Sequence, residues 1–186
     1  MGKTTLSENF DSSKLLEAID KAAKELIVDS LYTGRGHQQA GLRYLKLNNW
    51  IGVPASVISA LSSSGAALTA IFGANHAWTA LLAIIATIFT SLRAFLRTDK
   101  LADEHALKGR RYISLRNDVR IFRDIDMNSG ISVQELRKQI DTFRKRYNDL
   151  NEIPPLHIPR KDYEAAKKSI EAGESSYKGD RAWEEL

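Results

Sequence analysis

The chain of 186 residues contains no cysteine and only 4 prolines. Without cysteine, the protein can have no disulfide framework, no cysteine nucleophile and no thiolate metal site. With 11 glycines besides, the composition excludes collagen-like and low-complexity proteins. The net charge of +4 is too small to indicate nucleic-acid binding, and we expect none. These averages, with a mean hydropathy of -0.31, are those of an ordinary soluble protein.

Charge, however, is absent from one long segment. Residues 50–92 contain no Asp, Glu, Lys or Arg, although 27% of the whole chain is charged. Two apolar stretches, 50–72 and 77–96, are each long enough to cross a bilayer core, which takes about 20 helical residues. The uncharged, turn-forming run 73–76 separates them. The segment therefore predicts a transmembrane hairpin rather than two buried helices of a soluble bundle, which would carry a charged stripe.

Basic residues flank this hairpin on one side only. They precede the first span or lie at and beyond the end of the second, and the connecting run has none: Arg43, Lys46, Arg93, Arg97 and Lys100. By the positive-inside rule, we expect both termini in the cytoplasm of a multi-pass inner-membrane protein. Arg93, near the end of the second span, should extend its stem toward the same interface.

The first span carries small and hydroxylated residues along one helical face. They recur at spacings of four and three, and we call them the small-residue face: Gly52, Ser56, Ser59, Ser63, Ala66 and Ala70. Small faces let membrane helices approach closely, and hydroxyls can bond across the contact or face water. The face therefore fits either packing on the second span or lining a water-filled path. Because one hairpin cannot enclose a pore, a channel would require a homo-oligomer.

The rest of the chain, 1–49 and 97–186, is predicted to be helical throughout. Apolar residues at helical spacing predict a helix over 13–31, which the run Thr33–Gly36 should end. The second span should continue into the cytoplasm as one long helix to Arg123, because no proline interrupts it. The fold class is thus an all-α membrane protein with cytoplasmic helices on both sides of the hairpin.

A turn at 128–130 and a capping box from Ser132 to Glu135 introduce a further helix. Its apolar residues keep a strict alternation of three and four: Val133, Leu136, Ile140, Phe143, Tyr147 and Leu150. This heptad stripe can pair with the preceding helix as an antiparallel hairpin or with neighbouring subunits, and the first is favoured. An extended linker at 153–159 and a short helix over 161–172 precede a polar tail.

No motif for catalysis or for a cofactor is present. The four histidines lack metal-ligand spacing, and Gly2-Lys3-Thr4-Thr5 lacks the strand and glycine loop of a phosphate-binding motif. We therefore expect neither an enzyme nor a resident cofactor or metal. The basic region over 93–123 should face anionic lipid headgroups of the bilayer, with an anionic ligand such as a nucleotide as the alternative.

The order of motifs along residues 15–178 is distinctive. Two membrane helices are followed by a cytoplasmic helix with the pattern His105-x-x-x-Gly109-x-x-Tyr112-x-x-Leu115 and then by the heptad helix. After the heptad helix come a segment from Ile158-Pro159 to Tyr163 and a tail with Gly173-Glu174. This order resembles the SLATT family of bacterial two-transmembrane effector domains from conflict systems. The resemblance implies a membrane pore that opens when a partner sensor signals. It also implies packing or gating roles for His105, Gly109 and Tyr112.

Two functions remain open at this point. The first is an oligomeric pore in antiphage or other conflict defence, triggered by a cytoplasmic sensor protein, a nucleotide or oligomerisation. The second is a membrane-anchored helical interaction module without conductance. The serine-rich first span favours the pore, because an anchor has no use for hydroxyls in the middle of the bilayer.

Overall fold

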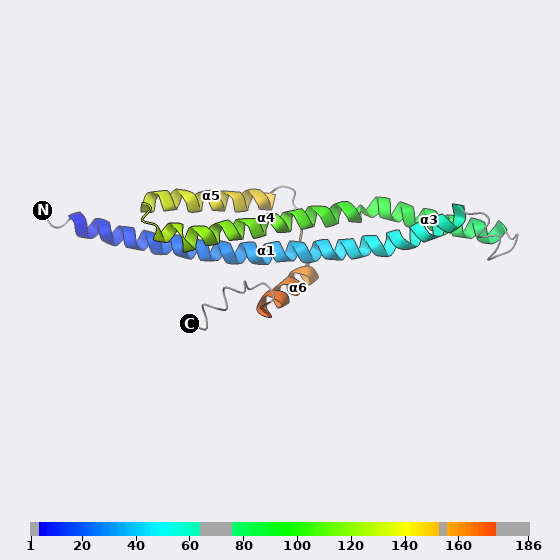
Figure 1. Cartoon of the computed structure of the whole chain (residues 1–186), viewed down its shortest axis with the longest axis horizontal. Coiled ribbons are helices and arrows are strands. Elements are labelled where there is room, and N and C mark those ends of the chain that lie inside the picture. The colour runs from blue at the N-terminus through cyan, green and yellow to red at the C-terminus, as the bar shows by residue number, and fades with distance from the viewer. Residues whose placement is uncertain (1–3, 64–75, 153–155, 174–186) are drawn as a thin grey trace. The chain divides into compact units, whose positions relative to one another are not determined.

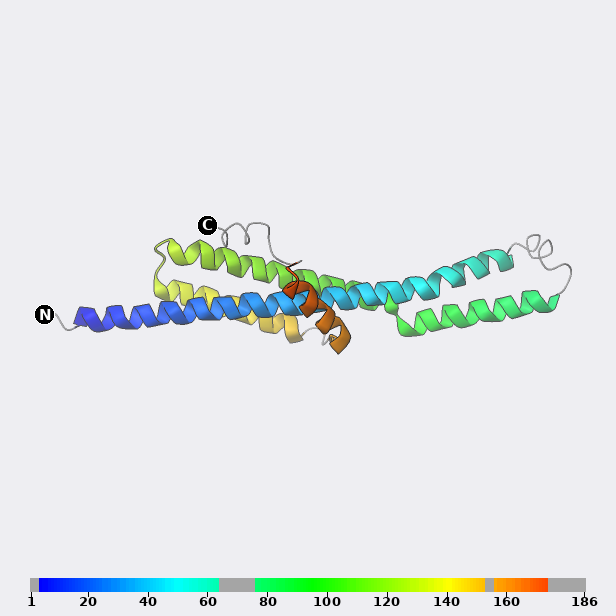
Figure 2. The same cartoon turned by 90° about the horizontal axis from the view of Figure 1, so that it is seen from below.

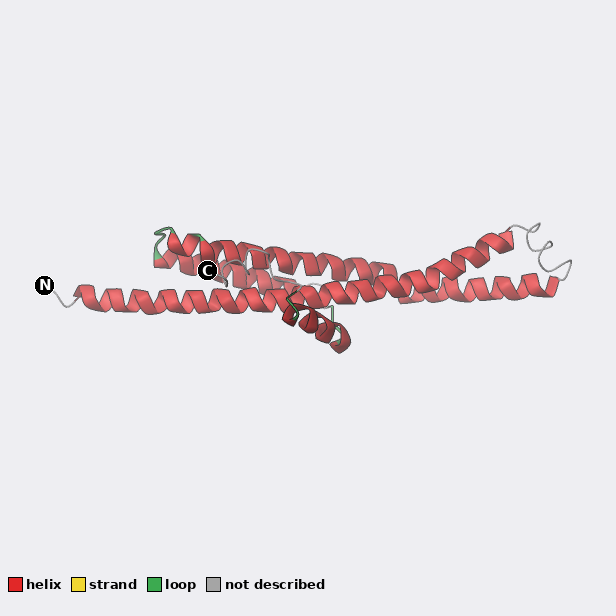
Figure 3. Cartoon of the chain, turned by 60° about the horizontal axis from the view of Figure 1, so that its bottom comes forward, coloured by secondary structure: helices red, strands yellow, loops and turns green. Residues whose placement is uncertain are grey.

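The computed structural model describes residues 4–63, 76–152 and 156–173, and in this part of the chain helices joined by short loops are the only regular secondary structure (Figure 3). The elements in chain order are α1 (Thr4–Ser63), α3 (His76–Leu96), α4 (Thr98–Asp124), the 3-10 turn η1 (Asp126–Asn128), α5 (Val133–Glu152) and α6 (Arg160–Glu171). The prediction of an all-α fold is confirmed. The chain divides into two compact units, one of Met1–Ala40 with His105–Leu186 and one of Gly41–Glu104.

The first unit has a hydrophobic core made by three helices. Its buried members come from α1, α4 and α5 in turn: Ile19, Ala22, Ala23, Leu26, Leu115, Val119, Phe122, Leu136 and Ile140. α5 runs alongside α4 (Figure 1), and the ring of Phe143 meets that of Phe122 edge-on at 5.6 Å. Burying one large apolar side chain contributes about 1.5–3 kcal/mol, so this core is the main source of the unit's stability.

The heptad stripe of α5 faces this core. Leu136 and Ile140 are buried in it, and the other four members pack against it partly buried: Val133, Phe143, Tyr147 and Leu150. The turn before α5 is formed by Gly130 at φ +79°, and Ser132 Oγ then accepts a hydrogen bond from the Glu135 amide at 3.3 Å. The stripe thus makes its contacts within one chain.

α1 does not end at Thr33–Gly36, so the predicted break is wrong. The two glycines lie where other parts of the unit approach α1 closely. A Cβ atom on Gly34 would lie 3.1 Å from Tyr112 Cβ, and one on Gly36 would lie 3.1 Å from Ile158 Cδ1. Glycine in a helix costs about 1 kcal/mol relative to alanine, and here the close packing offsets that cost.

α6 packs on α1 on the side away from α5 (Figure 1). Its Tyr163 ring lies 6.4 Å from that of Tyr32, and Ala166 is fully buried. The helix expected over 161–172 is confirmed, since α6 begins one residue earlier and ends one residue earlier. The polar tail beyond Gly173 lies outside the described residues.

In the second unit, α3 runs beside the C-terminal part of α1 (Figure 2). Among the described residues, one helical stretch, Ala80–Asn128, contains a window long and apolar enough to cross a membrane, and only 6% of that window is buried. Large apolar residues such as Ile84, Ile88 and Phe95 are exposed on α3. An apolar helix with so little burial is suited to lipid rather than to a protein core. The first predicted span is helical up to Ser63, and its remainder lies outside the described residues.

The prediction of one uninterrupted helix from the second span to Arg123 is wrong at one residue. Arg97 has φ +47°, in the left-handed region, and divides α3 from α4. Hydrogen bonds from the Arg97 amide to Arg93 O and from the Leu101 amide to Arg97 O still cross the division. The physical reason is an anchor on α1: Arg93 and Thr98, on either side of Arg97, both bond to Asn48, and the backbone bends between them.

Candidate functional site

The small-residue face is partly described, and its described members differ in exposure. Gly52 is buried, whereas Ser56 and Ser59 are exposed. Ser56 Oγ donates a hydrogen bond to the Gly52 carbonyl at 2.9 Å, which satisfies the hydroxyl within the helix. Ser63 is the last residue of α1. Ala66 and Ala70 lie outside the described residues.

Beside the small-residue face, a neighbouring strip of α1 is buried together with one residue of α3. Ile51 and Ala55 of α1 and Ala86 of α3 are each at most 8% exposed, and we call these three residues the α1–α3 seam. Ser56 and Ser59 lie outside this seam. The hydroxyls of α3, on Thr87 and Thr90, bond to carbonyls of their own helix at 2.8 and 2.9 Å. Packing of α1 on α3 therefore leaves the exposed serines unused.

A cleft of about 300 Å³ opens beside the small-residue face, and Arg93 reaches into it from α3. The lining residues are Asn48, Asn49, Gly52, Val53, Ser56, Val57 and Arg93. Arg93 Nε donates to Asn48 Oδ1 at 3.1 Å. Its Nη1 lies 3.3 Å from the position that a Cβ atom on Gly52 would take. Arg93 thus bonds to α1 just before the start of the first predicted span.

Asn48 holds a second residue by the same atom. Thr98 Oγ1 donates to Asn48 Oδ1 at 3.1 Å, and Thr98 is only 1% exposed. Asn48 lies one helical turn before Gly52, on the small-residue face. A single amide oxygen of α1 therefore fixes the end of α3 and the start of α4.

The other predicted membrane-face cations do not join this cleft. The Arg43 guanidinium lies over the ring of Tyr44, 4.8 Å from its centre. Lys100 pairs with Glu104 at 3.6 Å, and Lys46 and Arg97 are exposed. Of the five basic residues, Arg93 alone lines the cleft.

The structure brings together two histidines whose pairing was not predicted from the sequence. His37 of α1 and His105 of α4 are 2% and 1% exposed, and their Nδ1 atoms lie 2.9 Å apart. The His37 ring stacks on the Tyr112 ring, with their centroids 5.8 Å apart and an interplanar angle of 7°. Tyr112 in turn donates from its hydroxyl to Asn151 Oδ1 at 2.7 Å. Two hydrogen bonds and one stacked ring pair thus join α1, α4 and α5.

This cluster disfavours charge. Burial, the neighbouring His105 and the charge of Lys108 lower the pKa of His37 to about 4. Burial also lowers the pKa of Lys108, which is 6% exposed. Burial, with the nearby Tyr147, raises the pKa of the Tyr112 hydroxyl. At neutral pH the His37 ring is therefore uncharged, and a single Nδ1 proton lies between the two rings.

At Gly109, α4 lies close against α1. A Cβ atom on it would lie 2.9 Å from the Gly34 carbonyl oxygen and 2.9 Å from Gln38 Cγ. The helix α4 continues through Gly109, as predicted. The three residues that the family resemblance marked, His105, Gly109 and Tyr112, all face α1, as their contacts to His37 and Gly34 show.

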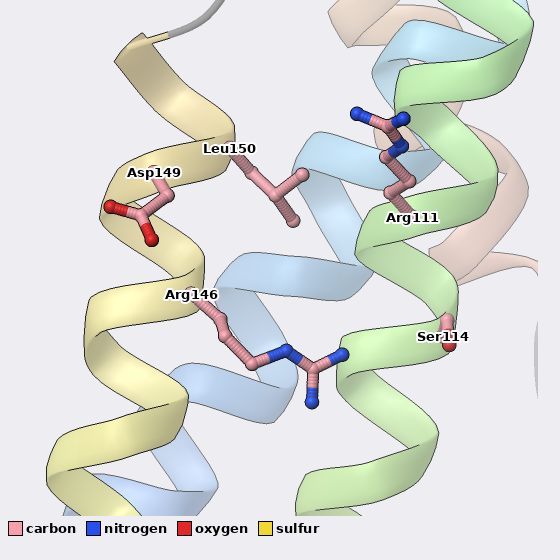
Figure 4. A pocket seen from close by; sticks show the side chains of 5 residues that line it. All are labelled: Arg111, Ser114, Arg146, Asp149 and Leu150. Carbon is pink, nitrogen blue, oxygen red and sulfur yellow. The ribbon is translucent and has the colours of Figure 1, made fainter.

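A groove of about 400 Å³ lies between α4 and α5, lined by Arg111, Ser114, Arg146, Asp149 and Leu150 (Figure 4). Arg146 Nη1 pairs with Asp118 Oδ2 at 3.0 Å, and Asp149 contributes a second carboxylate. Because the two arginines are balanced by two carboxylates, the groove gives little support to the anionic-ligand alternative. Within the described ranges, no group of three or more His, Asp or Glu side chains is arranged to hold a metal ion.

Comparison with known proteins gives one match. The model of a protein family, described as SMODS and SLOG-associating 2TM effector domain family 4, matches residues 19–181. Neither the curated proteins nor the solved structures contain a match to the chain. The matched range spans both units and includes Arg93, the His37–His105 contact and the heptad stripe. The chain therefore belongs to the SLATT family of 2TM effector domains, as a member of its family 4.

Proposed function

We propose that this protein is an oligomeric pore-forming effector that permeabilises the bacterial inner membrane in antiphage or other conflict defence. In this proposal, spans 50–72 and 77–96 form the transmembrane hairpin, and both termini lie in the cytoplasm. The family description, which names a 2TM effector domain, supports the two spans and the effector role. The basic residues on one side of the hairpin support the orientation.

The observation that carries the pore is the exposure of the serines on α1. Packing within the chain was the competing use of the small-residue face, and of its described members only Gly52 is buried, against Arg93, while the α1–α3 seam consists of other residues. Ser56 and Ser59 are thereby left for water or for a second copy of the chain. Both uses belong to an oligomer, since hydroxyl groups gain nothing from facing lipid.

The first unit provides the body that assembles and receives the signal. Its core of α1, α4 and α5 is complete within one chain, so oligomerisation requires no exchange of helices. The association with SMODS and SLOG proteins in the family description supports a partner sensor or a nucleotide as the trigger. The protein itself acts in this proposal without catalysis and without a cofactor.

Ion flux from liposomes that contain the purified full-length chain tests the proposal. We expect ions to leak from liposomes with the wild type, and the leak to be lost when Ser56 and Ser59 are both replaced by leucine. Thr87→Leu with Thr90→Leu is the matched control, because it makes the same chemical change on α3 and should leave the flux unchanged. A monomeric or dimeric protein without flux would favour the membrane-anchored interaction module instead.

A further inference from the structure

Arg93 belongs to α3, but its charged guanidinium group lies beside α1. The bond from its Nε to Asn48 Oδ1, at 3.1 Å, holds the guanidinium beside the small-residue face. Gly52 provides the space, since its missing Cβ would stand 3.3 Å from Nη1. A long, flexible cation is thereby fixed at one end of the face proposed to line the pore.

The charge of Arg93 is not neutralised in its cleft. The other lining residues are two asparagines, a glycine, a serine and two valines, and none carries a carboxylate. Among the described residues, Arg93 makes its polar contact with a neutral amide rather than with an acid. The side chain is also exposed, so water and dissolved ions can reach it. An anion that enters this cleft meets one full positive charge together with the side-chain amides of Asn48 and Asn49.

We infer that the conducted ions are anions and that Arg93 selects them. This inference rests on the proposed pore. In an oligomer whose small-residue faces surround the path, each chain contributes one Arg93 at the same level, and the copies form a ring of positive charge. Rings of arginine or lysine select anions in pores, as rings of acidic residues select cations. Chloride and small oxyanions are the class of permeant ion that fits.

The reversal potential across a planar bilayer, with a KCl gradient and the full-length chain, measures this selectivity. We expect the wild type to favour chloride over potassium by about fivefold or more, the factor that one unit charge produces at about 4 Å in water. Arg93→Gln should abolish the preference, and Arg93→Glu should invert it. Arg93→Lys keeps the charge and should keep the preference for chloride.

Lys46→Gln is the matched control. It removes the same charge from α1, at an exposed residue that does not line the cleft. We expect it to conduct with the selectivity of the wild type. A wild type that conducts without preferring chloride, or an Arg93→Glu variant whose selectivity is unchanged, would overturn the inference and leave the pore standing. An assembled wild type that does not conduct would overturn the pore and the inference together.

Discussion

The Nδ1 atoms of His37 and His105 are 68 positions apart in sequence and 2.9 Å apart in space. One ring must donate its proton to the other, so the contact requires an acceptor nitrogen without a proton. A proton on the accepting Nδ1 would remove the acceptor, and a proton on either ring would place a positive charge near Lys108, whose own burial already lowers its pKa. The contact between α1 and α4 is therefore sensitive to acid.

This geometry predicts how stability depends on pH. The pKa of His37 is about 4 in the folded chain and 6.5 in the unfolded chain, so the folded state binds fewer protons. The stability is fully present above pH 6.5 and is lost as the pH falls from there toward 4. The loss amounts to at most about 3–4 kcal/mol, since each pKa unit corresponds to about 1.4 kcal/mol.

Thermal unfolding followed by circular dichroism, in detergent at several pH values between 7.5 and 4.5, measures the effect. Replacing both His37 and His105 by glutamine should flatten the dependence in this window. His157→Gln, at an exposed position, should leave it as in the wild type. An equal pH dependence in the double variant and the wild type would show that the pair is not responsible.

Replacing Gly109 by alanine should destabilise the first unit. Its Cβ atom would meet a backbone oxygen, Gly34 O, at 2.9 Å, and backbone cannot rotate away as a side chain can. We expect a loss of about 1–3 kcal/mol, as for other overpacked cores. The same change in an unconstrained helix is stabilising by about 1 kcal/mol. The sign of the measured change in stability therefore shows whether Gly109 is closely packed against α1. Chemical denaturation measures this change in the free energy of unfolding, and Ser114→Ala, at an exposed position of α4, is the control.

Because the backbone of Arg97 is left-handed, we expect glycine to be more favourable than alanine at this position. Glycine adopts φ +47° without strain, whereas any other residue pays about 1–2 kcal/mol. Arg97→Gly should therefore be more stable than Arg97→Ala, the reverse of the order in an ordinary helix. Both variants lose the same charge, so their difference isolates the backbone. Melting temperatures in detergent that place alanine above glycine would contradict a left-handed residue at this position.

The parts of the fold that the sequence predicted well are set by local spacing. The heptad stripe from Val133 to Leu150 and the capping Ser132 depend only on residues within a few turns, and the helix forms as that pattern requires. The chargeless segment 50–92 likewise indicated a membrane helix by composition alone, and α3 has the exposed apolar surface expected of one.

The contacts that the sequence could not predict join distant positions. Gly34 alone resembles a helix breaker, and its real role depends on Gly109 in another helix. The available signal was a combination: Gly34 with His37 three residues later, and His105 with Gly109 four residues later, each pair on one helical face. Two small-and-histidine faces of this kind can be matched to each other. Nothing local marks Arg97 as left-handed, because its backbone follows from side-chain bonds on either side.

Asn48 makes those two bonds with one oxygen atom, which accepts from both Arg93 and Thr98. An asparagine whose side chain turned away would release the end of α3 and the start of α4 in the same event. The position of the Arg93 charge and the bend at Arg97 therefore depend on the same side chain. Rotation of the Asn48 side chain would break both hydrogen bonds and would thereby change the two features together.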